Sequence, residues 1–217
     1  MNTVIFDMDG LLIDSEPLWE EAATEAFARF GIHLSAEEYM ITTGLRTREF
    51  VTWWLTKSGI DEKEFESVEN EIITGIMLRI KTRAVIMPGV DQVIGLFRSR
   101  DFRIGVASSS PQQLIDLVMD MSGIGSYVHA TASAEHLPYG KPHPQVYLDC
   151  ARSLGTVPTA CICFEDSFNG MIAAKAARMK CVVVPHPSQA RQARWGAADL
   201  QLSSLLNFGQ LHLDQLS

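Results

Sequence analysis

Short apolar runs recur along the chain, and polar or helix-forming segments separate them. The runs are Val4–Phe6, Arg103–Ala107, Val128–Thr131, Cys161–Glu165 and Cys181–Val184. Runs of this length that are apolar at consecutive positions are typical of strands buried on both faces. We therefore predict a parallel sheet with helices packed on both of its sides.

The segments between the later runs carry apolar residues at helical spacing. They predict helices over Gly89–Arg100, Leu114–Met121 and Pro144–Leu154. Pro144 suits the first position of a helix, and the glycine at 155 suits a position just after its end. Strands that alternate with helices in this way indicate an α/β fold with a Rossmann-like, three-layer core.

The segment from Ser15 to Arg83 differs from the rest because it contains no strand-like run. Its pattern predicts helices from Pro17 to Phe30, over Thr47–Lys57 and over Glu62–Ile80. A connection of about seventy residues inside an α/β sheet is uncommon and usually has a function. We therefore expect two domains: a core of residues 1–14 and 84–217, and an all-helical cap of residues 15–83.

Composition narrows the class of protein. The chain has 217 residues, of which 47% are apolar and 20% charged, as in soluble globular proteins. A net charge of −8 argues against nucleic acid as a partner. The sequence shows no basic leader and no apolar run of about 18 residues, so we expect a cytoplasmic protein without a membrane partner. Nothing demands a dimer, and a monomer is expected. The four cysteines have no CxxC spacing, which favours buried, reduced thiols.

Polar residues gather directly after the predicted strands. Asp7 and Asp9 follow the first strand, Ser108–Ser110 the second, Lys141 the third, and Glu165-Asp166 ends the fourth. Each group has an ordinary explanation, such as a turn, a helix N-cap or a solvated charge. Ligands of open parallel sheets, however, bind beyond the carboxyl ends of the strands. We therefore expect these side chains to meet at one site.

Carboxylates that cluster without histidine or cysteine favour a hard cation such as Mg²⁺, for which Mn²⁺ or Co²⁺ can substitute. Such an ion, together with Lys141 and a serine hydroxyl, would bind a phosphate group. Asp7 could then attack phosphorus. Asp9 could protonate the leaving alcohol and later take a proton from water.

In order and spacing, these residues resemble the four motifs of the haloacid dehalogenase superfamily, and the likeness extends over the whole chain. The helical insertion is similar to the small cap of the β-phosphoglucomutase-like branch. The stretches Gly10–Trp19 and Lys141–Cys150 resemble those of bacterial hexitol and 2-deoxyglucose-6-phosphate phosphatases.

The resemblance implies a role for each motif. Asp7 would be the nucleophile and Asp9 the general acid and base. Phosphate would be bound by Ser108, Ser109 and Lys141. The metal would be held by the Asp7 carboxylate, the main-chain carbonyl of Asp9 and Asp166, with Glu165 as a supporting acid.

The resemblance also implies that the cap loop Thr42–Arg46 recognises the rest of the substrate. Arg46 would either bind a sugar hydroxyl or phosphate oxygen, or form a surface salt bridge. Three cap tryptophans would either pack between helices or line the cleft: Trp19, Trp53 and Trp54. Because Asp9 already serves as the base, His136 and His143 are not needed for that role.

Single positions separate the reactions known in this superfamily. The presence of Asp9 argues against a dehalogenase, and Trp19 stands where the mutases carry a histidine. The first cap helix has no lysine to form the Schiff base of a phosphonate hydrolase. We therefore expect a Mg²⁺-dependent phosphatase for small phosphorylated metabolites, namely sugar or sugar-alcohol phosphates such as 2-deoxyglucose 6-phosphate and hexitol phosphates. The alternatives are phosphoryl transfer of the phosphoglucomutase type and a catalytically silent sensor or partner-binding relative.

Overall fold

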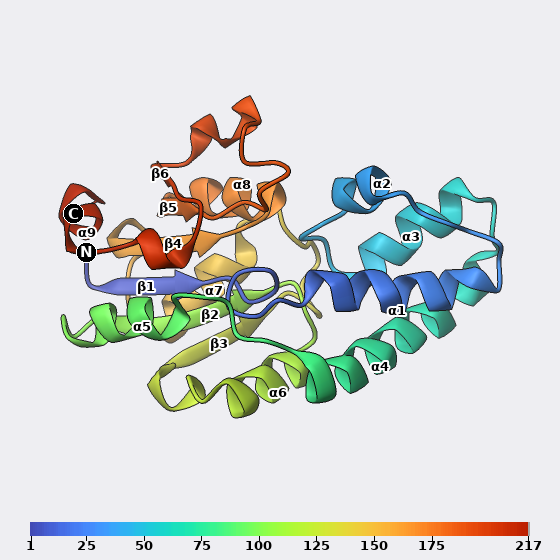
Figure 1. Ribbon diagram of the computed structural model, residues 1–217, viewed down its shortest axis with the longest axis horizontal. Coiled ribbons are helices and arrows are strands. Elements are labelled where there is room, and N and C mark those ends of the chain that lie inside the picture. The colour runs from blue at the N-terminus through green and yellow to red at the C-terminus, as the bar shows by residue number, and fades with distance from the viewer. Residues whose placement is uncertain (217) are drawn as a thin grey trace.

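A parallel six-stranded sheet forms one half of the computed structural model, which describes residues 1–216 (Figure 1). The strand order is β3-β2-β1-β4-β5-β6, so β1 lies at the centre and pairs with β2 on one side and β4 on the other. The strands are β1 (Thr3–Phe6), β2 (Arg103–Ser108), β3 (Ala130–Ser133), β4 (Cys161–Glu165), β5 (Lys180–Val183) and β6 (Leu200–Gln201).

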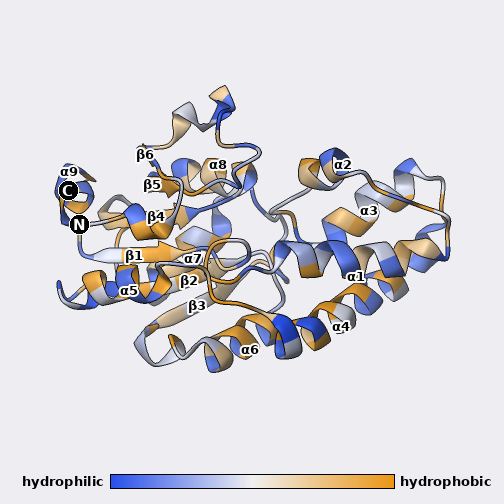
Figure 2. Cartoon of the chain, viewed as in Figure 1, coloured by the Kyte–Doolittle hydropathy of each residue, from blue (hydrophilic) through white to orange (hydrophobic). Residues whose placement is uncertain are grey.

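Helices cover both faces of the sheet, as the apolar runs predict. The helices of this half are α5 (Val90–Arg98), α6 (Gln112–Ser122), α7 (Gln145–Ser153), α8 (Phe168–Ala176) and α9 (Gln210–Leu216). Phe6 of β1 packs with α5, α6 and α9, whereas its neighbour Ile5 packs with α7 and α8 on the opposite face. Figure 2 shows apolar residues, in orange, along β1 and on the neighbouring helix α5. The fold is therefore the three-layer, Rossmann-like α/β arrangement that the sequence predicts.

The segment after β1 is all-helical and lies beside the sheet, on the right of Figure 1. Its helices are α1 (Glu16–Ala28), α2 (Ala36–Ile41), α3 (Thr47–Lys57) and α4 (Phe65–Arg83). The long helix α4 packs along α1 and buries Val68, Ile72, Ile76 and Ile80. We call α1–α4 the cap below; its boundaries as a domain at residues 15 and 83 stay a prediction.

Differences from the predicted elements are confined to ends and short pieces. The third strand begins at Ala130 rather than Val128, because a 3-10 turn over Gly125–Tyr127 precedes it and Ala130 is the first residue in register with β2. The predicted helix over 62–80 begins with a 3-10 turn and continues to Arg83. The short elements α2, β6 and α9 have too few residues for a clear apolar period. Within residues 1–216, none of the helices combines the length and apolar character that crossing a bilayer requires.

Candidate active site

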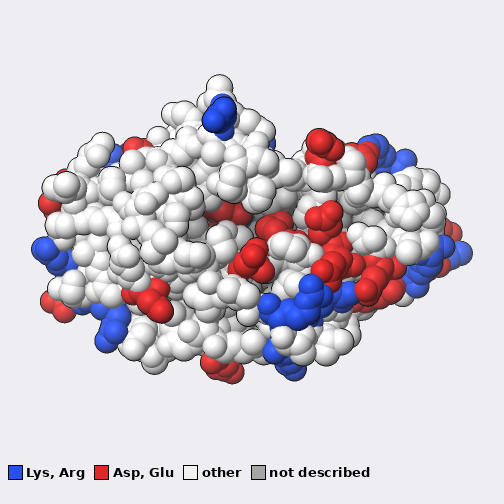
Figure 3. Space-filling view, in the orientation of Figure 1, with Lys and Arg blue, Asp and Glu red and all other residues white. Residues whose placement is uncertain are grey.

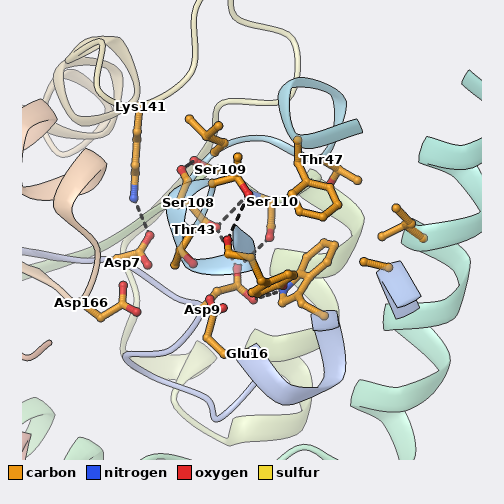
Figure 4. Close-up of a pocket in the computed structure, with 18 residues that line it drawn as sticks. Asp7, Asp9, Glu16, Thr43, Thr47, Ser108, Ser109, Ser110, Lys141 and Asp166 are labelled. Carbon is orange, nitrogen blue, oxygen red and sulfur yellow. Dashed lines mark hydrogen bonds and ion pairs between the residues drawn. The ribbon is translucent and has the colours of Figure 1, made fainter. Parts of the chain in front are cut away.

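The carboxyl ends of the central strands bring the predicted residues together around one cavity (Figure 4). Asp7 follows β1, Ser108 ends β2, and Glu165 ends β4. The adjacency of these three strands in the sheet therefore places side chains that are 158 residues apart in the chain beside one another. The cavity is lined by Asp7, Asp9, Ser108, Ser109, Lys141 and Asp166 from the predicted set.

Lys141 is buried at the base of this cluster. Its ammonium group lies 2.5 Å from Asp7 Oδ1 and 2.7 Å from Glu165 Oε1, and it also donates to the carbonyl of Ala107 at 3.2 Å. Burial alone would lower the pKa of Lys141, but the carboxylates of Asp7 and Glu165 raise it above its ordinary value. The side chain therefore stays positively charged and holds Asp7 in place.

Glu165 is fully buried, and hydrogen bonds surround its carboxylate. Oε1 accepts from Lys141 and from the hydroxyl of Tyr147. Oε2 accepts from the main-chain N–H groups of Asp166 and Ser167 and from the Ser167 hydroxyl, each at 3.0–3.1 Å. This carboxylate orients Lys141 and the start of α8, which agrees with the expected supporting role.

Gly170 makes room for that carboxylate. A Cβ atom at this position would lie 1.7 Å from Glu165 Oε1. The helix α8 can therefore pack against the buried acid only where it has no side chain. Gly10 does the same for the neighbouring acid: its φ is +71°, and a Cβ there would lie 2.3 Å from Asp166 Oδ2.

Asp9 connects the cap to the core. Its Oδ1 accepts from the Ser15 hydroxyl at 2.8 Å and from the indole N–H of Trp19 at 2.9 Å. Its Oδ2 accepts from the hydroxyls of Ser110 at 2.7 Å and Ser108 at 3.3 Å. Trp19 thus lines the cavity, and its indole group orients the carboxylate that we expect to move protons.

The acids near the cavity outnumber the cations. Asp7, Glu165 and Asp166 present carboxylate oxygens within 4.8 Å of one another, and Lys141 is the cation at their centre. Burial raises the pKa of Asp7 and of Asp166, and neighbouring carboxylates add to both effects. On the visible face in Figure 3, acidic side chains gather where the cap meets the sheet. An all-oxygen donor set with excess negative charge fits a divalent cation such as Mg²⁺.

The cap loop closes over the cavity through contacts with main-chain atoms. Ser109 donates to the carbonyl of Gly44 at 2.8 Å, and Asn169 donates to the carbonyl of Thr43 at 3.1 Å. Gly44 has a φ of +82°, and a Cβ there would lie 2.6 Å from Ser167 Oγ. The loop therefore approaches the core as closely as only a glycine allows.

The structure places Arg46 outside this cavity lining. Its guanidinium donates to the carbonyls of Leu137 at 2.5 Å and Ala134 at 3.3 Å, and it pairs with Glu49 at 2.7 Å. Glu49 in turn accepts from the N–H of Gly140 at 3.2 Å, directly before Lys141. Arg46 thus forms a salt bridge, which here joins the cap to the segment that carries Lys141; a contact of Arg46 with substrate stays a prediction.

The other two tryptophans and the two histidines lie outside this cavity. Trp54 is buried and donates to the Thr42 hydroxyl at 3.1 Å, while Trp53 is 54% exposed. His136 and His143 are absent from the cavity lining. Sequence reasoning missed Glu16, which lines the cavity from the first turn of α1. The sequence does not predict this position, because the turn at Gly10 decides whether a residue seven positions after Asp9 faces the cavity.

Comparison with known proteins agrees with this geometry. The model of the haloacid dehalogenase-like hydrolases matches residues 1–178. Hexitol phosphatase B of Escherichia coli (strain K12) is 43% identical over 202 residues, which cover 93% of this chain and 91% of that protein. Fructose-1-phosphate phosphatase of the same strain is 30% identical over 190 residues, covering 83% and 95%.

Solved structures share the fold. β-Phosphoglucomutase from Clostridium difficile superposes with a TM-score of 0.88 at 22% identity, over 99% of this chain and 96% of that one. CbbY from Rhodobacter sphaeroides, in complex with phosphate, gives 0.86 at 24% identity over 100% and 99%. With the four motifs gathered at one sheet edge and a family match over most of its length, the chain belongs to the haloacid dehalogenase-like hydrolases.

Proposed function

We propose that this enzyme hydrolyses small phosphomonoesters, namely sugar or sugar-alcohol phosphates, with Mg²⁺ and through an aspartyl-phosphate intermediate. Its class, a phosphatase, follows from the hydrolase family and from the phosphatases among its relatives. The observation that carries the proposal is Asp7: a buried carboxylate, 2.5 Å from the Lys141 ammonium, that lines the cavity beside Asp166.

In the proposed first step, an Asp7 carboxylate oxygen attacks phosphorus, and the bond between phosphorus and the ester oxygen breaks. Asp9 gives its proton to the departing alkoxide, so that a neutral alcohol leaves. In the second step, Asp9 takes a proton from water while the water oxygen attacks phosphorus, which releases phosphate and regenerates the Asp7 carboxylate.

Three groups would support these steps. Mg²⁺, held by Asp7, Asp166 and the main-chain carbonyl of Asp9, would neutralise charge on the transferring phosphoryl group. Lys141 keeps Asp7 in position and adds positive charge. Ser108 and Ser109 would bind phosphate oxygens, although their hydroxyls contact Asp9 and the Gly44 carbonyl in this conformation. A phosphate would therefore replace those acceptors.

Hydrolysis rather than transfer between substrates is favoured by Trp19. Its indole N–H donates to Asp9, and an indole carries no titratable nitrogen at neutral pH. Trp19 therefore orients the acid and base but cannot itself transfer a proton. The cap over the cavity excludes bulk solvent and favours a small substrate over a folded phosphoprotein.

The experiment that tests this proposal is Asp7→Asn, assayed with phenyl phosphate and Mg²⁺. We expect the variant to fold and to lose turnover, because an amide does not form the acyl-phosphate. Retained turnover would refute the assignment of the nucleophile. Wild-type phosphate release with Mg²⁺, and none with a chelator, would separate the enzyme from a catalytically silent relative.

A further inference from the structure

Glu16 occupies an unusual place in the cavity. It is the first residue of α1, and Figure 4 shows it beside Asp9 and near Asp166. Its Cγ would lie 3.4 Å from a Cβ on Gly10, the residue that gives Asp166 its room. The side chain therefore sits at the junction of the cap and the acid cluster, on the cap side.

Within residues 1–216, no protein group donates a hydrogen bond to the Glu16 carboxyl or pairs with it. The other acids at the site differ in this respect: Asp9 accepts from four side chains, and Asp7 pairs with Lys141. Burial, followed by the charges of Asp9, Asp14 and Glu20, raises the pKa of Glu16 to about 8. A carboxyl group held this way costs the fold stability, which points to a role in binding a ligand.

The surroundings narrow the chemistry of that ligand. Among the described residues that line the cavity, Lys141 is the cation, and it is already committed to Asp7, Glu165 and the Ala107 carbonyl rather than to Glu16. An acidic group without a neighbouring cation offers no electrostatic attraction to a phosphate group. On the cap side, the cavity lining combines the apolar side chains of Phe50 and Ile72 with hydroxyl-bearing residues, namely Tyr39, Thr42, Thr43 and Thr47. The groups best suited to meet Glu16 are hydroxyls on the part of the substrate that carries no phosphate.

We propose that Glu16 is a specificity-determining residue whose carboxyl group accepts hydrogen bonds from the hydroxyl groups of a polyol or sugar phosphate. This inference rests on the proposed function and names the feature that the enzyme recognises in its substrate. A site built to bond a substrate hydroxyl rejects an analogue without it more strongly than an apolar pocket does, because the buried polar group is then left unpaired.

The test compares two substrates of the same enzyme. Sorbitol 6-phosphate carries several hydroxyl groups on its carbon chain, whereas the phenyl group of phenyl phosphate carries none. The readout is the ratio of their kcat/KM values. In Glu16→Ala we expect this ratio to fall about 10- to 100-fold, the range for loss of one or two substrate hydrogen bonds. The matched control is Glu20→Ala, one turn further along α1, where the side chain is exposed and outside the cavity lining. Its ratio should stay within about twofold of wild type.

Glu16→Gln serves as the folding control, because it keeps the shape of the side chain and cannot ionise. Its melting temperature should equal or exceed that of wild type, since the amide never places a negative charge beside Asp9 and Asp14. A ratio that stays unchanged in Glu16→Ala would overturn the proposal. An equal loss on both substrates, with a higher Mg²⁺ requirement, would overturn it in favour of a role at the metal. A wild type that releases no phosphate from either substrate would instead refute the proposed function, and the inference with it.

Discussion

Substituting Gly170 with alanine should destabilise the protein, although alanine favours a helix. Gly170 lies inside α8, where glycine normally costs about 1 kcal/mol relative to alanine. A Cβ at this position, however, would lie 1.7 Å from Glu165 Oε1 and 2.4 Å from Oε2. The carboxylate or the helix must therefore move, and the bonds from Lys141, Tyr147 and Ser167 to Glu165 cannot all survive.

The size of the effect follows from the loss of partners around a buried charge. Removing one partner of a buried ion pair typically lowers the free energy of unfolding by about 3–5 kcal/mol. For a chain of this size, each kcal/mol corresponds to about 2–4 °C in melting temperature, so we expect a fall of about 6–20 °C. Phosphatase turnover should fall as well, because Lys141 loses one of the two carboxylates that hold it.

The assay is thermal unfolding followed by circular dichroism, with urea unfolding as a second measure. Gly95→Ala is the matched control: Gly95 lies in the exposed face of α5, and a Cβ there meets nothing within 4 Å. That variant should gain up to about 1 kcal/mol. A Gly170→Ala protein as stable and as active as wild type would refute the packing that we describe around Glu165.

Two further predictions concern proton transfer and the thiols. Asp9→Asn should slow hydrolysis of sorbitol 6-phosphate far more than that of p-nitrophenyl phosphate, whose leaving group needs little protonation; equal losses in kcat would argue against an acid role. All four cysteines are buried and unpaired, and burial raises the pKa of Cys150 to about 12 and of Cys161 to about 11. Because all four thiols are buried, the folded protein should resist iodoacetamide at pH 8 and unfolded protein should not. The free energy of unfolding should decline above about pH 8.5, where Cys150 and Cys161 begin to ionise in the unfolded chain but stay protonated in the folded one. Alkylation of all four thiols at equal rates in both states would contradict this.

The sequence predicts the sheet and the gathering of its motifs because both depend on simple periodic features. Consecutive apolar residues before Asp7, Ser108 and Asp166 define buried strands, and parallel strands place their ends together. What the pattern leaves open is where long side chains on the cap point. Arg46 is charged and next to a polar loop, so the sequence leaves a substrate oxygen and a surface salt bridge both open. The contacts of Arg46 with the carbonyls of Ala134 and Leu137 depend on the fold, which brings that segment beside the cap.

Glu16 escaped prediction for a related reason, whereas for Trp19 the sequence leaves helix packing and the cleft both open. Glu16 lies on α1 at a position whose direction depends on the left-handed turn at Gly10 and on how the cap packs against the core. The sequence does not predict short elements such as α2 and β6, because they have too few residues for a periodic pattern of apolar side chains to show.

Most of the hydrogen bonds that hold the cap loop and Arg46 region to the core have a main-chain group on one side: the carbonyls of Thr43, Gly44, Ala134 and Leu137, and the N–H of Gly140. Docking of this kind depends on the path of the backbone rather than on matched side chains. Apart from Gly44, residues in the loop over the cavity can therefore change during evolution without weakening these contacts between cap and core. Substitutions at residues that line the cavity could therefore change which substrate is bound, while the cap keeps its position on the core.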